Sequence, residues 1–170
     1  MKKIEIDFAP NGLGRVEFEV KIPVIGDRRK HQMFAQVTFK LDTASDFTTL
    51  SLRDLKKLGY KLDELKKCDF HIDSKTGERV LVNGRFPIQY MDDFMIIIGQ
   101  TVIKNVRVFF VTNESENLRS LFGGDITKYF NYTVNSDERR LTLWKMISEP
   151  DLIPGEIPIE ICAYTDENES

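Results

Sequence analysis

The chain is poor in cysteine, has no long apolar run and carries little excess charge of either sign. Only Cys68 and Cys162 occur among its 170 residues. Two thiols without a metal-ligand spacing are too few for a disulfide scaffold or a zinc site, so we expect reduced thiols and a cytoplasmic location. No apolar stretch approaches the roughly 20 residues of a membrane span, and we therefore expect no membrane partner.

The net charge of −3 argues against a strongly basic surface. Basic residues are dispersed apart from residues 28–30, which we interpret as a solvated loop. Nucleic-acid binding rests on many cationic contacts to phosphates, so we expect no nucleic-acid partner. The first three residues are followed by the alternating segment 4–8 rather than by an apolar block, and we expect no signal peptide.

The sequence contains few side chains in an arrangement that could hold a metal ion. His31 and His71 are isolated, and Asp92-Asp93 has no nearby histidine or third carboxylate. A metal site needs several such ligands together, so we predict none. We interpret Asp92-Asp93 as a turn between two strands.

Alternation of apolar and polar residues predicts a protein built mainly of β-strands. Residues 4–8 and 16–22 alternate on both sides of a Pro- and Gly-containing stretch, which predicts that they pair as a hairpin. Many short strands separated by turn residues are typical of an all-β barrel or sandwich. Further strands are predicted at 35–41, 70–73, 79–82, 86–90, 94–98, 106–111, 132–134 and 141–144.

One segment changes from a period of two to a helical period. Leu52, Leu55 and Leu58 lie three residues apart, after Ser51 and before Gly59. A serine is a good N-cap and a glycine commonly ends a helix, so we predict a short helix with one buried face.

The strand 35–41 delivers an aspartate followed by two small residues, Asp42-Thr43-Ala44. A carboxylate at the end of a strand can point into a cleft, and small residues after it let the backbone pack closely behind. The segment resembles the Asp-Thr/Ser-Gly/Ala motif of retropepsin-like aspartic proteases. A second segment, 121–125, resembles that family's second signature, and the two strands 132–134 and 141–144 follow it in the family's order. The resemblance runs from about Met33 to Trp144.

The resemblance implies a closed, retropepsin-like β-barrel with one or two short helices, spanning residues 1–147 as one homodimeric domain. It implies an aspartic endopeptidase that hydrolyses polypeptides without a cofactor or a metal. Only one Asp-Thr-Ala motif is present, so two copies of Asp42, one from each chain, would form the catalytic dyad. Thr43, Ala44 and Gly123 are implied to support the site, although Ala44 stands where glycine is commoner.

Three more residues are implied to contact substrate. Asp46 corresponds to an aspartate that binds substrate backbone, and a cap on the following turn is the alternative interpretation. A glycine-bearing hairpin tip normally closes over the substrate. Thr76-Gly77 is the favoured candidate and Asn83-Gly84 the other, although each could be an ordinary turn.

Residues 148–170 extend beyond the usual family domain. They comprise a Pro- and Gly-containing linker, an alternating segment at 156–162 and an acidic end at 165–170. Pro158 would restrict a strand there to a sheet edge. This tail could lie across the cleft or pair with a neighbour's edge. It leaves open the alternative that the chain is a catalytically inactive, dimeric domain that binds a peptide or a partner protein.

Overall fold

The computed structural model describes residues 3–24, 33–60, 66–68, 70–72, 79–81, 88–111, 119–152 and 156–164, with the backbone alone at 66–89 and at 111. Both candidate hairpin tips, Thr76-Gly77 and Asn83-Gly84, lie outside the described residues. The basic segment 28–30 and the acidic end 165–170 lie outside them as well.

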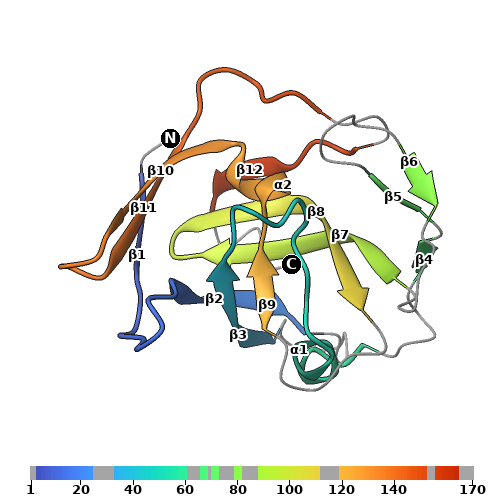
Figure 1. Cartoon of the computed structure of the whole chain (residues 1–170), viewed down its shortest axis with the longest axis horizontal. Helices are drawn as coiled ribbons and strands as arrows, with labels where there is room; N and C mark the ends of the chain where they lie inside the picture. The colour runs from blue at the N-terminus through green and yellow to red at the C-terminus, as the bar shows by residue number, and fades with distance from the viewer. Residues whose placement is uncertain are drawn as a thin grey trace.

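The described residues form a mainly β protein with two short helices, as predicted (Figure 1). No helix among them is long and apolar enough to cross a membrane. The elements are β1 (Ile4–Asp7), β2 (Glu17–Pro23), β3 (Phe34–Leu41), α1 (Leu52–Lys57), β4 (Lys66–Cys68), β5 (Phe70–Ile72), β6 (Arg79–Leu81), β7 (Ile88–Ile98), β8 (Thr101–Val111), β9 (Ser120–Phe122), α2 (Gly124–Thr127), β10 (Phe130–Asn135), β11 (Arg140–Lys145) and β12 (Glu160–Ala163).

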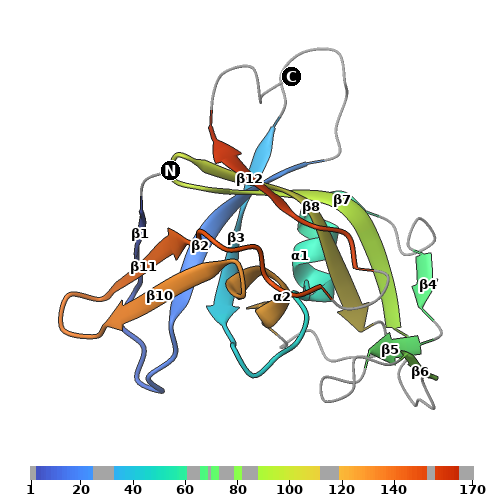
Figure 2. The same cartoon turned by 90° about the horizontal axis from the view of Figure 1, so that it is seen from above.

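The strands form three hydrogen-bonded sheets. The largest has the order β12-β8-β7-β2-β3-β9, with β4 added to β7, and it is strongly curled (Figures 1 and 2). A second sheet has the order β1-β11-β10, and β5 pairs with β6 in the third. The β5–β6 pair and the β10–β11 hairpin lie at opposite ends of the molecule in both views. The coarse fold class is confirmed, while closure into a barrel stays a prediction.

The core includes a cluster of aromatic side chains from β2, β3 and β9. Phe122 packs edge-on against Phe18 and Phe39, with ring centroids 5.3 and 6.0 Å apart. All three side chains are buried. Phe18 on β2 and Phe39 on β3 are therefore buried, as the period of two predicts. Both pack against β9, the strand that carries the second signature.

The predicted hairpin between residues 4–8 and 16–22 is wrong. β1 pairs with β11, so that Ile4 lies opposite Leu143, whereas β2 lies between β3 and β7. Alternation indicates which face of a strand is buried, but it does not indicate which strand is the neighbour. Both sides of β2 are occupied, and β1 belongs to the other sheet, beside β11.

The predicted turn at Asp92-Asp93 is also wrong. β7 continues through both residues, and the register with β8 shifts between Met91 and Phe94. Asp93 has a φ of 62°, which accommodates an extra residue as a bulge without reversing the chain. Asp92 forms a close ion pair with Arg107 on β8, at 2.6 Å.

The helix α1 and its caps match the prediction. The Ser51 hydroxyl accepts a hydrogen bond from the amide of Asp54, and Leu55 and Leu58 are buried. Gly59 follows the helix with a φ of 83°, a conformation that favours glycine.

The tail pairs with its own chain. β12 runs antiparallel to β8 at the edge of the largest sheet, with Ile161 opposite Ile103. Pro158 lies before the strand, where it removes no ladder hydrogen bond. Among the described residues β12 is the last strand of its sheet, and it covers only part of the predicted segment 156–162.

Candidate active site

Parallel pairing of β3 with β9 brings the two signature segments side by side. Leu41 lies opposite Phe122, and the amide of Asp42 donates to the Phe122 carbonyl at 3.1 Å. Residues 80 positions apart therefore leave adjacent strands at the same end of the sheet. The loop after Asp42 and the turn after Phe122 necessarily meet there.

Asp42 begins a tight turn and is half-buried. Its Oδ1 accepts hydrogen bonds from the amides of Ala44 and Ser45, each at 3.2 Å. Its Oδ2 accepts none from the described residues, so one carboxylate oxygen orients the side chain while the other is available. This is a geometry that a reacting carboxylate can use.

Thr43, Ala44 and Asp46 are exposed in the single chain. Neither the Thr43 hydroxyl nor the Asp46 carboxylate hydrogen-bonds a described residue, so no described contact shows Asp46 capping a turn. Their predicted roles in supporting the site and in binding substrate stay predictions.

The closest packing in the site is at Gly123. A Cβ atom on this residue would lie 2.4 Å from both the carbonyl carbon and the oxygen of Phe47, and 2.9 Å from the Thr48 nitrogen. Two further backbone hydrogen bonds hold the segments together, from Gly124 to the Ser45 carbonyl at 2.7 Å and from Asp125 to the Asp46 carbonyl at 3.1 Å. The loop formed by residues 42–48, here called the aspartate loop, is thus fixed against the start of α2.

A hydrogen bond between the half-buried Asp125 and the buried Thr48, which the sequence analysis missed, completes this attachment. The Asp125 carboxylate accepts from the Thr48 amide at 3.0 Å and from the Thr48 hydroxyl at 2.7 Å. The Thr48 Oγ1 in turn accepts from the amide of Gly123 at 3.2 Å. In the sequence, only the position of Asp125 within the second signature could have indicated this contact. Its partner lies 77 residues away, and no local pattern identifies it.

Burial raises the pKa of Asp125 from 3.8 to about 6. The two hydrogen bonds from Thr48 favour the ionised form and oppose this shift, whereas the negative charge of Glu156 adds to it. A carboxyl group beside the candidate active site therefore changes its charge within the mildly acidic range.

Because the folded-state pKa of Asp125 is raised, the folded chain holds a proton between pH 3.8 and about 6 that the unfolded chain has released. The stabilisation is complete below pH 3.8 and is lost as the pH rises through about 6. We expect this group to lower the free energy of unfolding by about 3 kcal/mol across that window. Urea unfolding at a series of pH values measures the slope.

Asp125→Asn removes the titration and is expected to flatten this pH dependence. Asp137→Asn, an exposed change in the β10–β11 turn, is the matched control and should keep the slope of the parent. An equal slope in the parent and in Asp125→Asn would show that another group titrates.

A row of half-buried side chains extends from Phe47 across β8 to Tyr90 on β7. The ring of Phe47 lies 4.6 Å from that of Phe109, which lies 6.0 Å from that of Tyr90. The Arg107 guanidinium stacks over Tyr90 at 4.6 Å. This row places an apolar surface next to Asp46.

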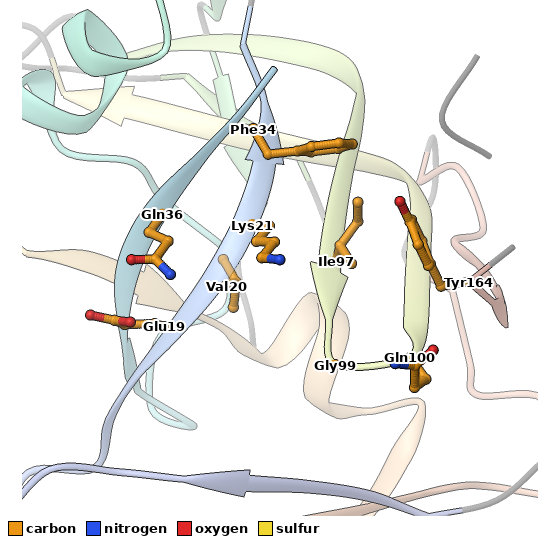
Figure 3. A pocket seen from close by; sticks show the side chains of 9 residues that line it. All are labelled: Glu19, Val20, Lys21, Phe34, Gln36, Ile97, Gly99, Gln100 and Tyr164. Carbon is orange, nitrogen blue, oxygen red and sulfur yellow. The ribbon is translucent and has the colours of Figure 1, made fainter. Parts of the chain in front are cut away.

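A separate cavity of about 380 Å³ lies on the outer face of the largest sheet, where β2 and β7 diverge (Figure 3). None of the predicted site residues lines it, and we do not assign it to the candidate active site. Its walls are Glu19, Val20, Lys21, Phe34, Gln36, Ile97, Gly99, Gln100 and Tyr164. Across the described ranges, no three His, Cys, Asp or Glu side chains are grouped so that they could hold a metal ion.

No protein-family model matches the chain, and no curated protein matches it. Among solved structures, the chain is similar to a retropepsin-like aspartic protease from Rickettsia conorii, with a TM-score of 0.55 and 18% sequence identity. The similarity covers 96% of this chain and 94% of that one. At this identity the comparison shows the fold alone. The chain therefore shares, over nearly its whole length, the overall fold of a retropepsin-like aspartic protease.

Proposed function

We propose that the chain is an aspartic endopeptidase that works as a homodimer, with Asp42 of each copy in one catalytic dyad. The observation that carries the proposal is the placement of Asp42, whose carboxylate is oriented by two amides at the end of β3. Its loop is fixed against the second signature at Gly123. The shared fold supports the same activity.

Two close carboxylates cannot both ionise readily, so they would share one proton around a water molecule. The ionised carboxylate would take a proton from the water, whose oxygen attacks the peptide carbonyl carbon. The protonated carboxyl would donate to the carbonyl oxygen. The amine nitrogen would then take the proton that came from the water as the C–N bond breaks, and a hydroxyl of the intermediate would return its proton to the other carboxylate. This chemistry needs neither a metal nor a cofactor, but it needs a second Asp42.

The second copy would pair through β10. This strand is the edge of its sheet within the described residues, and it follows α2 directly. Tyr132 and Val134 lie opposite the buried Leu143 and Leu141 but are 40% and 39% exposed. An edge strand with exposed apolar side chains is suited to pairing with another chain, and a two-fold axis uses the same strand twice.

A polypeptide substrate would bind in extended form beside the aspartate loop. Thr43, Ala44 and Asp46 are exposed there, and the Phe47–Phe109 row could receive an apolar side chain. We propose that the β5–β6 pair is the hairpin that covers the substrate, since Thr76 and Gly77 fall between its strands in the sequence. The free thiol of Cys162 suits the cytoplasm as the place of action.

Subunit mixing tests the shared dyad. Parent and Asp42→Asn chains are unfolded together in equal amounts and refolded, so that dimers form at random. A mixed dimer has one carboxylate and no dyad, and only about one quarter of the random dimers contain two parent chains. We therefore expect about one quarter, rather than one half, of the activity of parent chains at the same total concentration.

Half of the activity would mean that each chain works alone and would contradict the dimeric enzyme. Dilution with Asp137→Asn chains is the control and should leave the activity unchanged. A verified dimer of parent chains that cleaves nothing would favour the alternative, a peptide-binding domain without catalysis.

A further inference from the structure

The segment 156–164, here called the strap, is attached to both the end of α2 and the far edge of the largest sheet. Figure 2 follows the C-terminal segment, in red, from β11 past α2 and on to β12. Near α2, the Lys128 ammonium binds the Glu156 carboxylate at 2.6 Å and the Asp151 carbonyl at 3.1 Å. The amide of Ile159 donates to the Tyr129 hydroxyl at 3.3 Å.

The far end of the strap is held by the sheet. Ile159 and Ile161 pack against the core, and β12 adds four residues to the edge of β8. The amide of Tyr164 donates to the Gln100 carbonyl at 2.7 Å. The strap is therefore an ordered part of the fold.

The same helix holds the aspartate loop at its other end. The first residues of α2 bind Ser45 and Asp46 through their amides, and Asp125 binds Thr48. α2 has only four residues, so about 6 Å of helix separates the loop from Lys128. A single hydrogen-bonded turn has no internal hinge, and a displacement at one end moves the other.

We propose that the strap positions the candidate active-site loop through α2, with Lys128 and Tyr129 as the positioning residues. When the strap is docked, it holds α2 where the first residues of the helix hydrogen-bond the segment 45–48. This contact keeps the Asp42 carboxylate in its orientation. When the strap is released, the loop loosens while the remaining fold persists. The proposal rests on the proposed function only for its effect on catalysis.

Lys128→Met tests the coupling, with Lys145→Met as the matched control. Lys145 carries the same charge at the exposed end of β11 and forms no ion pair with a described residue. We expect the amides of Tyr164 and Thr48 to exchange with solvent about tenfold faster in Lys128→Met. The strap that carries Tyr164 would lose its attachment to α2, and the loop that carries Thr48 would be held less firmly by α2. Neither amide should change in the control.

The titration of Asp125, followed by carboxyl NMR, separates release of the strap from a plain charge effect. The charge that acts on Asp125 is that of Glu156, which is paired with Lys128, and Asp125 in turn acts on the Tyr129 hydroxyl. Loss of a cation from an unmoved strap would leave the pKa of Asp125 unchanged or raise it. Release moves Glu156 away and admits water, so we expect the pKa of Asp125 to fall.

Tyr129→Phe, which removes the acceptor for the Ile159 amide, provides a second variant with no change of charge. If Tyr164 exchanges faster while Thr48 and Asp125 are unchanged, the strap does not act on the loop. If neither variant, nor the two together, speeds exchange at Tyr164, α2 does not hold the strap. Either result overturns the proposal.

Peptide cleavage supplies the last readout. In Lys128→Met we expect kcat/KM to fall about tenfold with kcat reduced, since the loop carries the reacting group and also the proposed substrate contacts Asp46 and Phe47. An unchanged kcat would contradict the catalytic role of the strap. A parent chain that cleaves nothing would contradict the proposed function but would leave the exchange and titration results able to decide the coupling.

Discussion

Asp42→Asn is expected to lower kcat for peptide cleavage by about 10³-fold or more, because the dyad loses the carboxylate that takes a proton from water. The change is structurally mild. An asparagine Oδ1 can still accept from the amides of Ala44 and Ser45, so the turn keeps its two hydrogen bonds. We therefore expect the thermal unfolding midpoint to stay within about 2 °C of the parent.

A mixed peptide library, incubated between about pH 4 and 7, measures this loss over the range in which two carboxyls can share a proton. Asp137→Asn, on the exposed β10–β11 turn, should cleave like the parent. Cleavage by Asp42→Asn at the parental rate would remove Asp42 from the mechanism. The fold would then be retained without the chemistry proposed for it.

Gly123→Ala is expected to reduce the free energy of unfolding by about 3 kcal/mol. The new methyl would lie 2.4 Å from the backbone of Phe47, and the backbone there cannot turn aside as a flexible side chain could. Any relief has to separate α2 from the aspartate loop, which would also break the Gly123–Thr48 hydrogen bond. We expect activity to fall together with stability.

Gly124→Ala is the matched control for this substitution. Its Cβ atom would approach the Ser45 carbonyl oxygen at 3.3 Å, a tight contact but not a clash. Alanine also favours the helix that Gly124 begins, so we expect a change within about 1 kcal/mol. Urea unfolding of both variants gives the comparison. Equal losses would show that the close approach at Gly123 does not hold the loop.

The elements that the sequence predicted well are those set by local chemistry. α1 begins at its serine cap and is followed by a left-handed glycine, and both ends depend on residues within one turn of the helix. β3 alternates from Phe34 and delivers Asp42 at its end. β10 and β11 pair around a polar turn, where the amide of Glu138 donates to the Asn135 side chain. In each case the residues that decide the outcome are neighbours in the chain.

The candidate site was only half predictable for the same reason. Asp42 and Gly123 belong to recognisable segments, but the contact between Asp125 and Thr48 depends on the parallel pairing of β3 with β9. The bulge at Asp93 and the pairing of β1 with β11 are likewise decided by which strands become neighbours. A period of two is equally compatible with several such arrangements.

Local patterns along the chain were enough to establish the mainly β character of the protein, its short capped helix and the aspartate at a strand end. These follow from side-chain periodicity and from backbone preferences that act over a few residues. The surroundings of that aspartate depend instead on contacts between distant parts of the folded chain. The fold placed Gly123 where a methyl group has no room, and it brought the half-buried Asp125 carboxylate onto Thr48. It also tied the tail to the same helix through Lys128 and Glu156. Those contacts join residues tens of positions apart, and they exist only because the curled sheet closes the distance between them.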